Sequence, residues 1–202
     1  MLTPPRSASG LPRRPLMLLA LLAVTAGLWL ALPSAPATGQ SARKTHPLVG
    51  QQAPLWQVPT WGNLPPDTNA PEVTDFEGKT IYLYCFQSWC PGCHSSGFPT
   101  LKKVREHYAD NDNVVFLAVQ TVFEGFDTNH HERGVQIVTE KFGLDIPVGH
   151  SGSPDRPSKL MRSYRTGGTP WTLIIGPDRV LHYGDFHIDA GEAIKLIDGL
   201  QP

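Results

Sequence analysis

Cysteine is scarce in this sequence, which has three cysteines in 202 residues: Cys85, Cys90 and Cys93. One close pair and one further cysteine cannot make the framework of several disulfides that stabilises small secreted proteins. The sequence also has no second Cys-x-x-Cys, although structural zinc sites commonly combine two such pairs or one pair with two histidines. The cysteines therefore indicate a reactive pair, Cys90 and Cys93, and a third cysteine, Cys85, without a role in the redox chemistry.

Excess charge is also missing, because 17 lysines and arginines stand against 18 acidic residues and give a formal net charge of -1. No basic stripe with interleaved aromatic residues is present, so no nucleic-acid partner is expected. The 19 glycines and 20 prolines are scattered and follow no repeat, which excludes collagen-like order. A chain of this length with 40% hydrophobic residues is typical of one globular domain with accessory segments.

One long apolar run stands near the N-terminus. Arg6, Arg13 and Arg14 precede an uncharged apolar segment at residues 16–32. This order is typical of a secretory signal, and the run is also near the length that spans a bilayer. Both interpretations stay open, with the membrane anchor favoured, and small residues at 35–37 offer a cleavage site. With the arginines inside, the remainder of the chain is expected outside the cytoplasm.

The sequence thus divides into two parts. Residues 1–40 are predicted to be a signal peptide or membrane anchor with part of a linker, and residues 41–202 the folded domain. The expected location is the cell membrane, with the domain on the periplasmic side, or the periplasm itself if the signal is cleaved. Residues 33–47 are rich in proline, serine and alanine, as linkers are.

Hydrophobic periodicity places strands and helices along the domain. An irregular lead-in with one short strand is expected at 48–75, and Asp189 is a plausible N-cap of the last helix. The other predicted elements, in chain order, are a strand at 80–86, a helix following the cysteines, a strand at 114–122, helices at 135–142 and 159–164, a hairpin of strands at 171–175 and 180–183, and a helix at 190–200. This alternation predicts an α/β fold with a central mixed sheet and helices on both faces.

The Cys-x-x-Cys motif lies between a predicted strand and a predicted helix. Its spacing places both sulfurs within one helical turn, near enough to form a disulfide. Cys90 falls at the helix N-terminus, where free N–H groups and the helix dipole stabilise a thiolate. Pro91 suits the first helical position, because the N–H that proline lacks has no partner there. The pattern predicts that Cys90 attacks a disulfide and that Cys93, one turn later, resolves the mixed disulfide.

Four motifs together resemble the thioredoxin superfamily, and within it the TlpA/ResA-like membrane-tethered reductases. They are Ser-Trp-Cys-Pro-Gly-Cys at 88–93, Val-Gly-Gln-Gln-Ala-Pro at 49–54, Asp-Phe-Glu-Gly-Lys at 75–79 and Gly-Thr-Pro at 168–170. The resemblance covers about residues 48–200 and implies a thioredoxin-like three-layer sandwich. It also implies a cis Thr169–Pro170 bond facing the cysteines and an extended substrate pairing beside Thr169. Trp89, directly before Cys90, would either pack beside the sulfurs and shield them or fill the core as an ordinary aromatic residue.

The function that the resemblance implies is thiol–disulfide oxidoreduction, with the reduction of disulfides in extracytoplasmic proteins favoured. The expected partners are protein thiols and disulfides and a membrane thiol electron donor, and neither a cofactor nor a metal is expected. Two rivals use the same cysteines. A peroxiredoxin-like peroxidase shares the fold but relies on a lone peroxidatic cysteine, and a copper chaperone would use both thiols as soft ligands for Cu(I).

The sequence departs from the family's pattern at three places. Tyr84 stands six residues before Cys90, where thioredoxins carry an aspartate, and the stretch 94–97 lacks the acidic residue of many TlpA/ResA-like proteins. The proline that kinks the first helix matches Pro99, one residue late. The proton acceptor for Cys93 is therefore not identified, and His94 is a candidate to tune the thiols. The long polar link at 123–134 is a candidate to shape partner choice.

Overall fold

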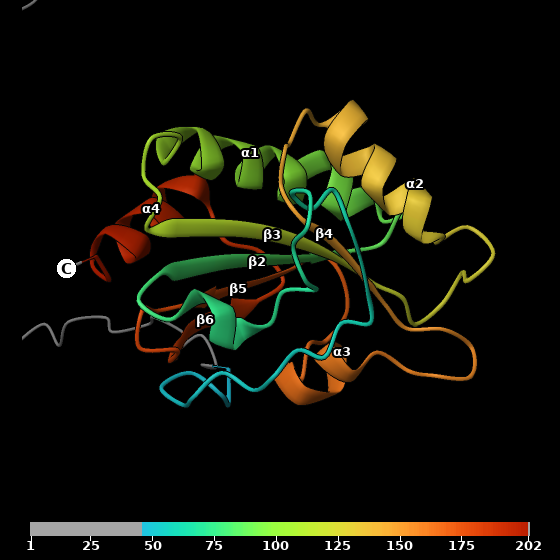
Figure 1. Ribbon diagram of the computed structural model, residues 1–202, viewed down its shortest axis with the longest axis horizontal. Coiled ribbons are helices and arrows are strands. Elements are labelled where there is room, and N and C mark those ends of the chain that lie inside the picture. Colours follow the sequence, from blue (N-terminus) through green and yellow to red (C-terminus); the bar gives the residue numbers. More distant parts are fainter. Residues whose placement is uncertain (1–45, 202) are drawn as a thin grey trace, which may run out of the picture. The chain divides into compact units, whose positions relative to one another are not determined.

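One six-stranded sheet organises the computed structural model, which describes residues 46–201 (Figure 1). Strands β2, β3 and β4 are parallel, whereas β1, β5 and β6 pair antiparallel with their neighbours. The sheet is therefore mixed, as the sequence predicts. Across the sheet the strands are β1 (Thr60–Gly62), β4 (Val148–Ser151), β3 (Val114–Thr121), β2 (Thr80–Phe86), β5 (Trp171–Ile175) and β6 (Leu181–Asp185).

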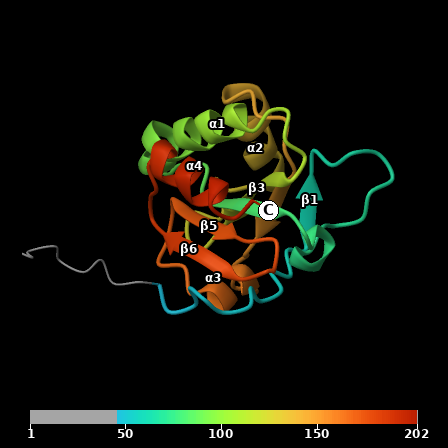
Figure 2. The ribbon, with the colours of Figure 1, turned by 90° about the vertical axis from the view of Figure 1, so that its left-hand side faces the viewer.

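Helices cover both faces of this sheet. Figures 1 and 2 show α1 (Phe98–His107), α2 (His131–Gln136) and α4 (Ala190–Asp198) on one face, and α3 (Lys159–Tyr164) on the other. The three-layer arrangement predicted from the sequence is therefore confirmed.

Strand β2 divides its side chains between two hydrophobic cores. Successive strand residues point to opposite faces, so Tyr82, Tyr84 and Phe86 pack in the core beneath α1 and α4. The alternate residues Ile81, Leu83 and Cys85 pack in the second core, with α3 and the lead-in segment. All seven residues of β2 are buried, which explains why this segment is a continuous apolar run rather than an alternating one.

The predicted elements are present, with shifts at their ends. The helix expected at 135–142 begins earlier, at His131, and its second half is a π-helical segment, Ile137–Lys141. The lead-in contains the short strand β1 and a 3-10 turn, Val73–Phe76. Asp189 caps α4 as predicted, because its carboxylate accepts a hydrogen bond of 2.8 Å from the N–H of Gly191.

Strand β4 is missing from the sequence prediction. Its four residues, Val-Gly-His-Ser, contain one strongly apolar side chain and show no strand periodicity. Pairing with β3 on one side and with β1 on the other makes this segment a strand. Gly149 allows that packing, since a Cβ built there would lie 2.9 Å from a methyl carbon of Val58.

The predicted signal or anchor at residues 1–40, with its apolar run at 16–32, lies outside the described residues. Among residues 46–201, none of the helices combines the length and the apolar character that crossing a bilayer requires.

Candidate redox site

The candidate site lies at the carboxyl ends of the parallel strands β2, β3 and β4. Strand β5 begins at the same end of the sheet because it runs antiparallel to β2. Cys90 follows the end of β2, and Thr169–Pro170 directly precedes β5. The pairing of β2 with β5 therefore brings together two motifs that are about eighty residues apart in the sequence.

Cys90 and Cys93 form a disulfide, with their Cα atoms 5.3 Å apart. The helical backbone begins at Pro91, so Cys90 is the residue immediately before the helix, as the sequence predicts. The N–H of Cys93 donates a hydrogen bond of 3.2 Å to Sγ of Cys90. In the reduced protein this N–H is placed to stabilise a thiolate on Cys90.

The two sulfurs differ in their access to solvent. Cys90 is 4% exposed, whereas Cys93 is fully buried in the core beneath α1 and α4. A partner's disulfide can therefore reach Cys90 first, and Cys93 lies behind it. This order of access agrees with the predicted roles of attacking and resolving cysteine.

The Thr169–Pro170 peptide bond is cis, as the resemblance implies. A Cβ built on Gly92 would lie 3.3 Å from Cδ of Pro170, so the proline ring packs directly against the backbone between the two cysteines. Thr169 and Pro170 are half-buried. The structure thus places Pro170, one of the predicted supporting residues, beside the turn that holds the disulfide.

Two exposed aromatic side chains border this site. Trp89, which directly precedes Cys90, is 47% exposed, and Phe186, which follows β6, is 45% exposed. The rings of Phe186 and Trp171 pack edge to face with centroids 4.7 Å apart. Phe186 also lies against the backbone of Gly168. Exposed aromatics flanking a reactive sulfur offer apolar contact area to a partner protein.

The turn that holds Cys93 is π-helical. Residues Cys93–Gly97 form a π-helix in which the N–H of Phe98 bonds to the carbonyl of Cys93. A π turn contains one residue more than an α turn. Pro99 follows directly after this π turn, in the first turn of α1.

Tyr84 lies beneath this π turn. Its hydroxyl donates to the carbonyl oxygen of Cys93 at 3.4 Å, and the phenol occupies the space that a side chain at Gly97 would fill. Burial raises the pKa of Tyr84 well above its usual value, so the phenol stays neutral. Where thioredoxins carry a carboxylate, this chain therefore has a neutral hydrogen-bonding group.

His94 is held between two partners. Its Nδ1 lies 3.0 Å from the ammonium of Lys141, which can only donate, so Nδ1 is the acceptor. Nε2 then carries the proton and donates to the carbonyl of Ser88 at 2.7 Å. The ring also stacks on Phe142, with centroids 5.6 Å apart. His94 thus joins the loop before Cys90 to the end of the π segment at 137–141.

A buried polar network supports the same loop. Asn129 accepts hydrogen bonds from the N–H of Ser88 at 2.8 Å and from Nε2 of Gln120 at 3.1 Å. Gln120 also bonds to the hydroxyl of Ser88, and its Oε1 accepts from Nδ1 of His150 at 3.0 Å. Asn129 belongs to the long polar link at 123–134, so this link is fastened beneath the active-site loop.

Sequence reasoning did not single out this network. Gln120 stands near the end of an apolar strand and is fully buried, and Asn129 is 2% exposed within a polar loop. The one available signal was a glutamine inside a buried strand, since a buried amide needs partners. Which partners it finds depends on the pairing of β3 with its neighbours.

Cys85 points away from the redox pair. It belongs to the core on the α3 face of the sheet, whereas Cys90 and Cys93 belong to the opposite core. Burial raises the pKa of its thiol. Cys85 is therefore a core residue with a free thiol, which agrees with the expectation from the sequence that it takes no part in the redox chemistry.

Comparison with known proteins finds no matching family model. Curated relatives include probable nucleoredoxin 3 of Oryza sativa subsp. japonica, 30% identical over 106 residues, which are 52% of this chain and 21% of that protein. Another is the thiol-disulfide oxidoreductase ResA of Geobacillus thermodenitrificans, 26% identical over 103 residues, 51% of this chain and 52% of that protein. The chain thus matches about half, or less, of the length of these relatives.

Solved structures match over more of their length. A thioredoxin-like superfamily protein superposes with a TM-score of 0.66 and 27% identity, covering 74% of this chain and 95% of the other. A thiol-disulfide isomerase from Corynebacterium glutamicum superposes with a TM-score of 0.62 and 25% identity, covering 73% of this chain and 96% of the other. These matches show the fold and include redox proteins.

Proposed function

We propose that this chain, which has a thioredoxin-like fold and thiol–disulfide oxidoreductase relatives, is itself a thiol–disulfide oxidoreductase. The observation that supports this most is the placement of Cys90. Its sulfur lies at the start of a helix, accepts an N–H from Cys93, and adjoins Pro170 through Gly92. This arrangement stabilises a thiolate at the one sulfur of the pair that a partner can reach.

The reaction proceeds in two exchanges. The Cys90 thiolate attacks one sulfur of a partner's disulfide, which forms a mixed disulfide and releases the partner's other sulfur as a thiolate. Cys93, deprotonated, then attacks Sγ of Cys90, which releases the partner's second thiolate and closes the Cys90–Cys93 disulfide. The partner's disulfide gains two electrons and takes up two protons, and the cysteine pair loses both.

The favoured direction is reduction of disulfides in extracytoplasmic proteins. Each turnover leaves the Cys90–Cys93 pair oxidised, so a thiol donor must return two electrons to it. We place that donor in the membrane, to which residues 16–32 would tether the chain. The charged-then-apolar order of the N-terminal sequence supports this location.

The test uses the full chain in non-ionic detergent, with insulin as the disulfide substrate and dithiothreitol as the electron source. Cys90→Ser should abolish turnover. Reduced Cys93→Ser, incubated with insulin after removal of dithiothreitol, should accumulate a mixed disulfide, since the resolving thiol is gone, and later addition of dithiothreitol should release it. Cys85→Ser is the matched control, and its activity should equal that of the unaltered chain. Turnover that survives Cys90→Ser would overturn the proposal.

The direction has a separate measurement, the reduction potential of the Cys90–Cys93 pair. A value near that of thioredoxin, about -270 mV, would support a reductase, whereas a value near about -120 mV would mean that the protein donates disulfides. The same variants separate the two rivals. Peroxide consumption that survives Cys93→Ser but not Cys90→Ser would favour a peroxidase, and one Cu(I) bound per reduced chain would favour a copper chaperone.

A further inference from the structure

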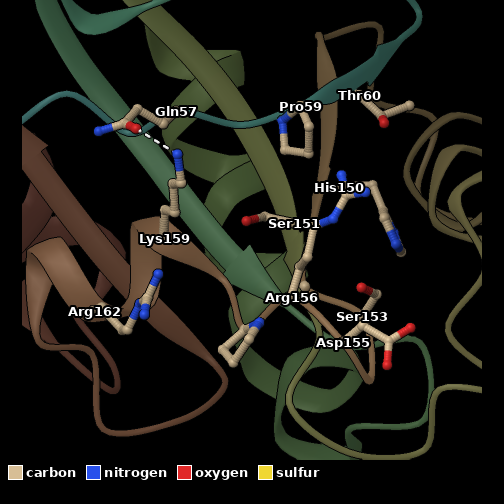
Figure 3. A pocket seen from close by; sticks show the side chains of 12 residues that line it. Gln57, Pro59, Thr60, His150, Ser151, Ser153, Asp155, Arg156, Lys159 and Arg162 are labelled. Atoms are coloured by element: carbon tan, nitrogen blue, oxygen red, sulfur yellow. Dashed lines mark hydrogen bonds between the residues drawn. The ribbon is translucent and has the colours of Figure 1, made fainter.

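A cavity separate from the redox pair opens where β1, the end of β4 and α3 meet (Figure 3). Its volume is about 720 Å³, within the range of small-molecule sites in proteins. Three cationic side chains line it, Arg156 from the loop after β4 and Lys159 and Arg162 from α3. Neither Cys90 nor Cys93 is among the lining residues.

The charge of this cavity is unbalanced. Its three cations face one acidic lining residue, Asp155, which leaves a formal charge of +2 (three minus one), although the whole chain carries -1. The ion pairs found in residues 46–201 are Arg179–Glu77 and His182–Asp178, and neither involves the cavity. None of the three cations is therefore ion-paired with a carboxylate of the described chain.

Two of the cations, Lys159 and Arg162, belong to a helix that hydrogen bonds fix to the sheet. Ser151, 1% exposed at the end of β4, shares a hydrogen bond of 2.9 Å with Ser158, which in turn accepts from the N–H of Met161 and so ties α3 to the sheet. Lys159 and Arg162 are three residues apart, so they lie on the same side of that helix. Lys159 also donates to Oε1 of Gln57 at 2.9 Å, and two of its ammonium protons remain for a ligand (Figure 3).

We infer that this cavity is a binding site for a small organic dianion, such as a phosphate monoester or a dicarboxylate. Guanidinium groups bind phosphate and carboxylate oxygens through paired, charge-assisted hydrogen bonds, and a dianion matches the net charge of the lining. A cavity bounded by three elements of the chain suits a compact molecule better than an extended acidic segment of a partner protein. The inference does not require the redox activity, because Cys90 and Cys93 do not line the cavity.

The test is calorimetric titration of the full chain in non-ionic detergent. The probes are inorganic phosphate and succinate, with acetate as the monoanion and succinamide as the uncharged analogue of succinate. Phosphate or succinate should bind saturably at one site per chain, and acetate and succinamide at least tenfold more weakly. Lys159→Gln should weaken binding about tenfold, and the double variant Arg156→Gln/Arg162→Gln should abolish it.

Lys103→Gln is the matched control, because it removes the same charge from an exposed position on α1 outside the cavity. It should bind the probe as the unaltered chain does, and so should Cys90→Ser, which separates this inference from the redox function. Equal weakening by Lys103→Gln and Lys159→Gln would overturn the inference, because it would reveal a general charge effect. Binding of a peptide of aspartates without binding of phosphate or succinate would overturn it too.

Discussion

The phenol of Tyr84 occupies the space that any side chain at position 97 would need. The hydroxyl oxygen of Tyr84 and two of its ring carbons fall well inside contact distance of a Cβ built on Gly97. The backbone of Gly97 has φ of -63°, which any residue can adopt, so the glycine is required by the close approach and not by its conformation. The pair joins the centre of β2 to the turn that carries Cys93.

Replacing this glycine should disrupt the turn. Gly97→Ala should lower the free energy of unfolding by about 3 kcal/mol, at the upper end of overpacking costs, because the methyl group meets a buried ring. Gly199→Ala is the control, since a Cβ there makes ordinary contacts, and it should change stability by less than about 1 kcal/mol. Urea unfolding measures both. Adding Tyr84→Phe to Gly97→Ala should restore part of the loss, and a purely additive result would contradict this relationship.

The three thiols should differ in reactivity. After reduction with dithiothreitol and its removal, iodoacetamide at pH 8 should label Cys90 first and Cys93 much more slowly, because Cys93 is fully buried. Cys85 should be labelled only after unfolding, because burial raises the pKa of its thiol and closes access to it. Mass spectrometry of the digested protein assigns each site. Labelling of native Cys85 at the rate of Cys90 would show that the α3-side core opens readily.

The buried amide of Asn129 should stabilise the active-site loop. Asn129→Ala should cost about 2 to 3 kcal/mol, because it leaves the N–H of Ser88 and the amide of Gln120 without this acceptor. The same change should speed hydrogen exchange at the Ser88 amide. Asn113→Ala, at an exposed turn, is the control and should stay within about 0.5 kcal/mol of the unaltered chain. Equal stability of the two variants would refute the role of the network.

Stability should fall in mild acid through His150. Burial lowers its pKa below 6.5, and the neighbouring His131 lowers it further, while Glu132 opposes this shift. Since the unfolded chain binds this proton more readily, the contribution of His150 is present above pH 6.5 and is lost as the pH falls through the folded-state pKa. His150→Asn keeps a donor near Gln120 without titrating. Urea unfolding at pH 7.5 and pH 5.5 should therefore show a smaller loss for His150→Asn, and an equal loss would count against this assignment.

Trp89 and Phe186 should contribute to the binding of protein substrates. Replacing either with alanine should raise KM for insulin about tenfold, because each removes an exposed aromatic contact beside the site. The rate with glutathione disulfide, which has far less apolar surface than insulin, should change little. Leu55→Ala is the matched control, because Leu55 is exposed to a similar extent, 46%. Leu55 is far from the cysteines in the sequence, whereas Trp89 directly precedes Cys90. A tenfold rise with Leu55→Ala as well would point to a general loss of surface hydrophobicity.

Much of the site could be predicted from the sequence because the patterns that indicate it involve neighbouring residues. The start of the helix at Pro91 and the cap at Asp189 depend on neighbouring residues, and both are as predicted. The apolar runs of β2 and β3 were recognisable since both strands are buried along almost their whole length. The cis bond at Pro170 came from the resemblance and not from any local pattern.

The sequence by itself determined the cysteine pair that forms a disulfide, the alternation of strands and helices, and the mixed sheet, because hydrophobic periodicity and helix-capping chemistry act over a few residues. Only the tertiary structure decided that β4 is a strand, that Cys85 faces away from the pair, and that Tyr84 lies against Gly97. It also decided which cations gather around one cavity. Each of these depends on contacts between segments far apart in the chain, and such contacts are fixed by packing once the sheet has assembled.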